Sequence, residues 1–251
     1  MKLKNKKIIE IGICMLYLLI LFPKIGSSQS PSLILNPSEK NLVQRCFIEY
    51  DGKKRTECVA VGDISGIHYA IDISNGSIIN VWRGGFIDVT TMWTDRGELQ
   101  LAIPLGKKII LSDIPTFSLS KASNQPSSNS AQDKLSFKGY SLNSENRPIF
   151  QYRFNNCEIT DKTEPGKDYK GLNRELKFNG PIESVSNTTA VLAEATKIEK
   201  INKNLYAINN QEYYILIDEK KHKVTLQNNQ GKESLISIPN KGNSIQYSIL
   251  W

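Results

Sequence analysis

The chain has 251 residues, of which 23% are charged, and its formal net charge is +7. Residues 1–28 hold five Lys and one Glu, a net of +4, which leaves only about +3 for the rest of the chain. A charge this small argues against a nucleic-acid-binding surface. The two His and four Cys show no Cys-x-x-Cys, His-x-x-x-His or haem-attachment spacing, so we expect neither a metal nor a cofactor.

The N-terminal segment is typical of an export signal. Residues 1–7 (MKLKNKK) are basic, residues 8–22 are apolar except for Glu10, and residues 26–28 are small. This order predicts a secretory signal peptide that is cleaved after residue 28, and a periplasmic or extracellular protein without a membrane span. The alternative is an uncleaved anchor, although an apolar run of about 15 residues is short for a span that needs roughly 20.

Two cysteines flank the first turn signal. Cys46 and Cys58 lie on either side of Asp51-Gly52, so a hairpin about this turn brings them opposite each other or one step off register. In an exported protein this predicts a disulfide between Cys46 and Cys58. The alternative is two buried thiols on neighbouring strands. Cys157 is left over, and we interpret it as a buried structural thiol.

The first predicted block, residues 31–117, consists of short β-type segments. Alternating apolar and β-branched residues separated by Asp51-Gly52 and Asn75-Gly76 indicate hairpins. The predicted strands are residues 43–50, 55–61, 68–73, 77–83 and 107–112. Residues 118–134 are rich in Ser and Asn and poor in apolar residues, which predicts a linker or an exposed loop.

The second predicted block, residues 135–251, continues the same pattern. Its predicted strands are residues 137–142, 148–154, 157–163, 172–178, 204–208, 212–218, 223–227, 234–238 and 245–251. Residues 190–195 are compatible with one helical turn or with a strand. Because the C-terminus is apolar and ends on Trp251, we expect a docked last strand. Together these features predict an all-β, antiparallel, sandwich-like fold, whose two blocks can pack around one shared core.

One segment concentrates aromatic and charged residues. Trp82, Arg83, Asp88, Trp93 and Arg96 lie within 15 positions. An aromatic face with Arg and Asp at its rim suits a sugar ring, because the ring stacks while its hydroxyls need polar partners. The same residues suit a structural network in which Arg83 or Arg96 pairs with Asp72, Asp88 or Asp95 and fixes a loop across the sheet.

Parts of the chain resemble a region of large exported proteins of the Bacteroidetes and Planctomycetes type. The matching residues are His68-Tyr-Ala-Ile-Asp72, Trp82-Arg-Gly84-x-Phe86-Ile-Asp88, Met92-Trp93-x-x-Arg96-Gly97, Pro104-Leu-Gly106, Phe150-x-Tyr152 and Asn173-Arg174-x-Leu176, and the resemblance covers roughly residues 42–180. In those proteins the region accompanies a c-type cytochrome domain and a sugar-dehydrogenase-like propeller. The resemblance implies an accessory β region whose partner, a cytochrome or a sugar dehydrogenase, carries the cofactor.

The functional hypothesis is therefore a non-catalytic accessory or carbohydrate-binding protein, with Trp82, Arg83, Asp88, Trp93 and Arg96 as ligand-binding residues. A second hypothesis is a sugar-active enzyme, an epimerase or hydrolase, which uses Asp88 with His68 as acid and base. His68 also fits a partly buried strand position. A third hypothesis is a structural subunit of an envelope assembly.

Overall fold

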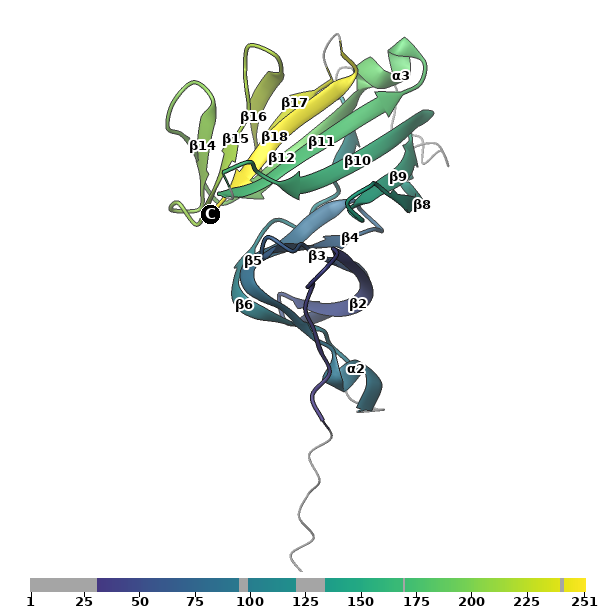
Figure 1. Cartoon of the computed structure of the whole chain (residues 1–251). Coiled ribbons are helices and arrows are strands. Elements are labelled where there is room, and N and C mark those ends of the chain that lie inside the picture. The colour runs from purple at the N-terminus through teal and green to yellow at the C-terminus, as the bar shows by residue number, and fades with distance from the viewer. Residues whose placement is uncertain (1–30, 95–98, 121–133, 169, 240–241) are drawn as a thin grey trace, which may run out of the picture. The chain divides into compact units, whose positions relative to one another are not determined.

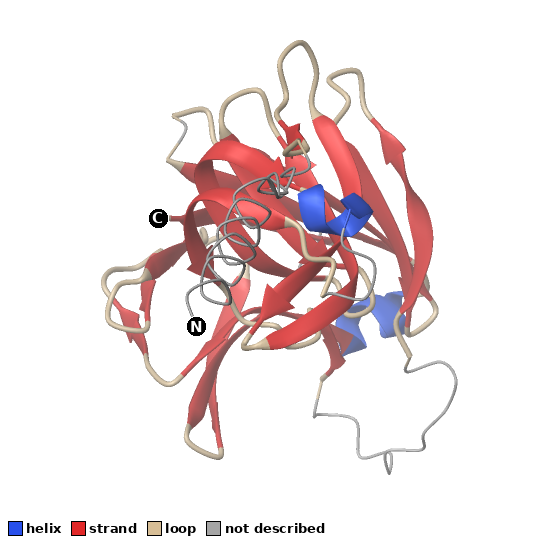
Figure 2. Ribbon diagram, turned by 90° about the horizontal axis from the view of Figure 1, so that it is seen from below, coloured by secondary structure: helices blue, strands red, loops and turns tan. Residues whose placement is uncertain are grey.

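The structure is a computed structural model that describes residues 31–94, 99–120, 134–168, 170–239 and 242–251. Antiparallel strands in three sheets account for most of these residues, as Figure 2 shows. The described helices are α2 (Thr90–Thr94) and α3 (Ile182–Asn187). The predicted all-β, antiparallel class is confirmed.

The first sheet has six strands in the order β1-β5-β4-β3-β2, with β6 also paired to β5. Its strands are β1 (Ile34–Leu35), β2 (Leu42–Tyr50), β3 (Lys53–Gly62), β4 (Ile67–Asp72), β5 (Ser77–Asp88) and β6 (Ile103–Ile110). Asp51 and Gly52 join β2 to β3 with φ of 49° and 69°, the left-handed geometry of a two-residue hairpin turn.

This sheet curls until β2, at one edge, forms hydrogen bonds with the residues that flank β6, at the other edge. The amide of Ala102 donates to the carbonyl oxygen of Phe47 over 2.8 Å, and the Tyr50 hydroxyl donates to the carbonyl oxygen of Leu111 over 2.8 Å. One face of the curled sheet then encloses a small apolar core. That core contains Cys46, Ile48, Cys58, Ala60, Ala70, Ile79, Trp82, Phe86, Ile87, Val89 and Ala102.

The second sheet has eight strands in the order β13-β14-β15-β18-β11-β10-β9-β8, and Figure 1 labels β10 and β11 in green and β18 in yellow. Its strands are β8 (Ser136–Leu142), β9 (Pro148–Phe154), β10 (Cys157–Pro165), β11 (Gly171–Asn179), β13 (Ile198–Lys200), β14 (Leu205–Ile208), β15 (Tyr213–Leu216) and β18 (Ser244–Leu250). The C-terminal strand β18 lies between β11 and β15, which confirms the docked terminus.

The third sheet, in the order β16-β17-β12-β7, corrects the predicted block boundary. Its strands are β7 (Phe117–Leu119), β12 (Thr188–Ala195), β16 (Lys223–Asn229) and β17 (Lys232–Ile238). The sequence pattern predicts that Ser118 and Leu119 belong to the linker, but in the structure they lie in β7, which pairs with β12 of the second block. Residues 121–133 of that linker lie outside the described residues. Residues 190–195 belong to strand β12, and α3 before it was not predicted.

The two predicted blocks share a core. The outer face of the curled sheet contributes Val59, Tyr69 and Val81 to the main apolar cluster, and the eight-stranded sheet contributes Phe150 and Leu172 to the same cluster. Because alternate residues of each strand point inward, each sheet presents one apolar face to the other. Residues Ser32–Trp251 accordingly form one compact unit.

The predicted disulfide is absent from the structure. Cys46 and Cys58 face each other directly across β2 and β3, as the turn predicts, but both are free thiols. Burial raises the pKa of Cys46 to about 12 and raises that of Cys58 further above its usual value. Oxidation needs the thiolate, which this apolar environment disfavours. Cys157 is buried and free, as predicted.

Candidate functional site

The structure does not place Trp82 and Trp93 on one aromatic platform. Trp82 is fully buried, and its indole N–H donates to the carbonyl oxygens of Gly85 at 3.1 Å and Phe86 at 2.9 Å. Its ring stacks on Phe86 with a centroid separation of 6.1 Å. Trp93, in contrast, is 68% exposed on α2. Trp82 is therefore a core residue, and assigning it to a ligand site was wrong.

The other residues of that cluster have separate roles. The Arg83 guanidinium lies 4.7 Å from the centre of the Trp251 ring and donates to the Trp251 carbonyl oxygen. Asp88 accepts hydrogen bonds from the amide and hydroxyl of Thr90, at the start of α2. Arg96 lies outside the described residues. Among the described members, the structure shows no convergence on a common cleft.

His68 is a structural residue of the curled sheet. Its Nε2 lies 2.9 Å from the Gly84 carbonyl oxygen, and its Nδ1 accepts from the Asp63 amide over 3.2 Å. These partners assign the neutral tautomer with the proton on Nε2. Burial lowers the pKa of His68 below its usual value. Both ring nitrogens are bound to the backbone, so the proposed acid–base role of His68 with Asp88 has no support.

A buried ion pair within the eight-stranded sheet also contacts the curled sheet. Arg174 on β11 donates to both carboxylate oxygens of Asp161, over 3.0 and 2.6 Å, and to the Tyr247 hydroxyl over 3.1 Å. It also donates to the Gly76 carbonyl oxygen at the β4–β5 turn over 2.6 Å. Burial alone would lower the pKa of Arg174, but Asp161 and Tyr247 raise it above its usual value.

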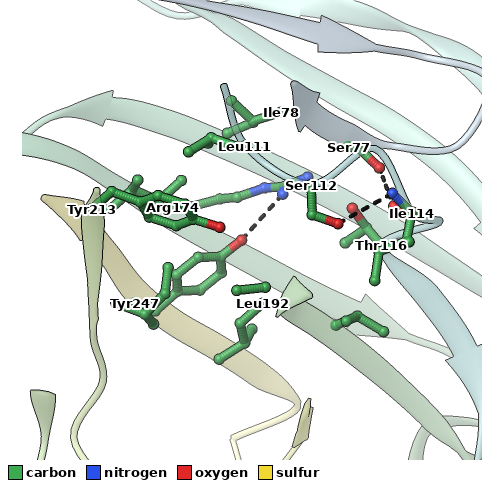
Figure 3. A pocket seen from close by; sticks show the side chains of 14 residues that line it. Ser77, Ile78, Leu111, Ser112, Ile114, Thr116, Arg174, Leu192, Tyr213 and Tyr247 are labelled. Atoms are coloured by element: carbon green, nitrogen blue, oxygen red, sulfur yellow. Dashed lines mark hydrogen bonds between the residues drawn. The ribbon is translucent and has the colours of Figure 1, made fainter. Parts of the chain in front are cut away.

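The cavity beside Arg174 is too small for a ligand. Figure 3 shows Arg174 and Tyr247 among side chains from both sheets, with their hydrogen bond drawn. The enclosed volume is about 20 Å³, which is room for about one water molecule. The Arg174 network thus fixes how the β4–β5 turn packs on the second sheet.

The larger concavity lies on the opposite, solvent-facing side of the eight-stranded sheet. We call it the polar groove; its volume is about 590 Å³. Strand alternation points Arg174 and Tyr247 inward and their neighbours outward into the groove. The outward groove residues are Lys162, Glu164, Asn173, Glu175, Leu216, Gln246 and Ser248, and the adjoining loops add Asn204 and Asp218.

The groove side chains form two rows across neighbouring strands. Glu164 is opposite Asn173, which is opposite Ser248, and Ser248 is opposite Leu216. In the second row Lys162 is opposite Glu175, which is opposite Gln246. Side chains that are directly opposite on one face lie about 5 Å apart. The rows therefore present amide, hydroxyl and carboxylate groups at regular short spacing.

Hydrogen bonds hold the groove side chains in place. The Ser248 hydroxyl donates to Asn173 Oδ1 over 2.7 Å, and the Gln246 amide donates to Glu175 Oε1 over 2.5 Å. Lys162 pairs with Glu164 at 2.8 Å. An amide side chain offers two donors and an acceptor, so Asn173 and Gln246 each use only part of their hydrogen-bonding capacity in these contacts. The groove can thus donate and accept hydrogen bonds with a bound molecule.

The described residues contain no titratable cluster that suggests a bound metal. In the part of the chain that the structure describes, no group of three or more His, Cys, Asp or Glu could hold a metal ion. None of the described helices is long and apolar enough to cross a membrane.

The groove was not predicted from the sequence. Its residues come from positions between 162 and 248 and meet only because β18 pairs with both β11 and β15. The available signal was alternation in β11, where Asn173 and Glu175 take outward positions around an inward Arg174.

Comparisons with family models, with curated proteins and with solved structures find no match for this chain. The relation to exported Bacteroidetes and Planctomycetes proteins, and the cytochrome or dehydrogenase partner that it implies, stay predictions.

Proposed function

We propose that this protein is a non-catalytic carbohydrate-binding protein and that the polar groove is its binding site. The observation that carries the proposal is the pair of amide, hydroxyl and carboxylate rows within a recess of about 590 Å³. This volume lies within the range of sites that hold small organic ligands, roughly 300–1,000 Å³.

The chemistry of the rows matches a polyhydroxylated ligand. Each sugar hydroxyl both donates and accepts, so it needs a donor and an acceptor close together. Asn173 beside Ser248 and Gln246 beside Glu175 provide such combinations across β11 and β18. Leu216, at the end of one row, offers apolar surface to the C–H face of a sugar ring.

The charges in the groove favour a neutral ligand. Glu164 is paired with Lys162 at 2.8 Å, and Glu175 with Lys177 at 3.1 Å. Because each carboxylate has a cationic partner, the sheet surface has little excess charge to attract an anionic or cationic molecule. The export signal predicted in residues 1–28 would place this groove where free glycans occur.

Calorimetric titration with a panel of neutral oligosaccharides tests the proposal. We expect binding by the wild-type chain and at least a tenfold weaker affinity for the double variant Asn173→Ala/Gln246→Ala, because it loses a bidentate group from each row. Glu158→Gln is the matched control, since Glu158 is an exposed residue of β10 outside the groove and on its face of the sheet. The absence of binding by the wild type, or equal affinity of the double variant, would overturn the proposal.

A further inference from the structure

One edge of the third sheet is open along a whole strand. Strand β16 (Lys223–Asn229) pairs with β17 through every one of its residues, and among the described strands none pairs with its other side. The unpaired side of an edge strand presents backbone N–H and C=O groups that a further strand can bind. This edge is therefore a candidate surface for contact with another chain.

The other sheet edges in the described part of the chain are blunted or occupied. Strands β1, β7 and β13 have only two or three residues. Strand β6 contains Pro104 and two Lys, and β2 is bonded to the residues that flank β6. Strand β8 is interrupted by a bulge between Phe137 and Gly139. Short length, proline, lysine and bulges keep a sheet edge from pairing, and β16 has only Lys223, at its first position.

The turn after β16 determines which of its backbone groups face outward. Residues 230–231 form a two-residue turn with φ of 51° and 81°, which makes Asn229 and Lys232 the closing hydrogen-bonded pair. Hydrogen-bonded and non-bonded pairs alternate along antiparallel strands, so every second residue of β16 turns its backbone groups away from β17. These outward residues are Val224, Leu226 and Asn228.

Leu226 lies at the centre of the open edge. It is opposite the fully buried Leu235 of β17, so its side chain is on the core-facing side of the sheet. Leu226 is nevertheless 47% exposed, because it belongs to the outermost strand. A strand that paired with β16 would extend this face and remove the Leu226 side chain from water.

We propose that β16 pairs in antiparallel fashion with β16 of a second copy of the chain, about a twofold axis at Leu226. Such a contact is closed, since each strand supplies the edge that the other needs. With Leu226 opposite its own copy, Val224 is opposite Asn228 of the second copy. All three outward residues then exchange backbone hydrogen bonds, about six in total. The third sheets of the two copies become one continuous sheet.

The side chains of β16 are complementary to a second β16. Lys223 is the only charged residue of the strand, and the symmetric register places it opposite Asn229. The two Lys223 side chains are then at opposite ends of the contact, about 20 Å apart, and do not repel each other. The two Leu226 side chains meet at the axis on the core-facing side and cover each other. Symmetry thus satisfies the charge and the apolar position together.

Sedimentation equilibrium of the protein expressed from the full sequence tests the proposal. We expect a dimer with a dissociation constant below about 100 µM. Leu226→Lys places two like charges opposite each other at the axis and should weaken the dimer at least tenfold. Leu142→Lys is the matched control, because Leu142 is an exposed aliphatic residue of the edge strand β8, and it should leave the dimer unchanged.

Disulfide cross-linking tests the register. Leu226→Cys places two thiols directly opposite each other, within the Cα separation of about 4.4–6.8 Å that a disulfide needs, so mild oxidation should give a covalent dimer. Thr225→Cys should not, because Thr225 is opposite Gln227 of the second copy. The native Cys46, Cys58 and Cys157 are buried and do not compete. A monomer at 100 µM, a dimer that Leu226→Lys leaves unchanged, or cross-linking through Thr225→Cys in place of Leu226→Cys would overturn the proposal. The polar groove shares no residue with β16, so its carbohydrate binding is tested independently.

Discussion

Replacing Arg174 by Met should destabilise the fold by about 3–5 kcal/mol, because it leaves the Asp161 carboxylate charged and unpaired in the interior. The structure supports a value of this size. The Asp161 side chain is fully buried and receives two hydrogen bonds from Arg174, and the Gly76 carbonyl oxygen loses its Arg174 donor as well. The loss is comparable to the lower end of the stability of a typical domain, about 5–15 kcal/mol.

Urea unfolding followed by circular dichroism measures this effect. Arg153→Met is the matched control, because the Arg153–Glu158 pair lies on the same sheet with both side chains at least half exposed. Such exposed pairs contribute only about 0–1 kcal/mol. The double variant Asp161→Leu/Arg174→Met should recover most of the loss, since it removes the buried charge together with its partner. A loss below about 1 kcal/mol for Arg174→Met, or no recovery in the double variant, would refute this reasoning.

Three further predictions concern burial and close packing. Burial lowers the pKa of His68, so near pH 6.5 the unfolded chain binds a proton that the folded chain does not. The free energy of unfolding should therefore fall below that pH by up to about 1.4 kcal/mol per pH unit. Between pH 7.5 and 5.5 the urea midpoint should drop less for His68→Gln than for the wild type, and an equal drop would contradict this. Iodoacetamide at pH 8 should modify Cys46 and Cys58 only after unfolding, as followed by peptide mass spectrometry; recovery of a linked peptide pair would show that the thiols oxidise. Gly171→Ala should lower the free energy of unfolding in urea by about 1–3 kcal/mol, because the added Cβ would overlap the Ile249 carbonyl oxygen on β18. A decrease near zero would argue against this strand pairing.

Local patterns predicted much of the fold. Asp51-Gly52 forms a two-residue turn with positive φ, and the strands that it joins begin and end close to the predicted residues. These features depend on neighbouring residues, so the sequence alone carries them. The pairing of β7 with β12 joins positions about 70 residues apart, and no local pattern specifies it.

The site was harder to predict because the type of a residue does not determine which face of a sheet its side chain occupies. Trp82 and Trp93 are eleven positions apart, yet one is buried in the curled sheet and the other is exposed on α2. The ligand-site hypothesis required both at the surface, whereas the structural alternative did not. The groove residues Asn173 and Gln246 are ordinary outward polar residues of β11 and β18, and only sheet order makes them neighbours.

Side-chain amide resonances offer the most direct test of the central claim, that the polar groove binds carbohydrate. In ¹H–¹⁵N spectra recorded during titration with the oligosaccharide of highest affinity, the side-chain NH₂ groups of Asn173, Gln246 and Asn204 should shift together and saturate with one dissociation constant. Backbone amides of β11 and β18 should shift with them, while the Trp93 indole N–H should not move. Shifts centred on Trp93 and α2, with the groove amides unchanged, would contradict the account.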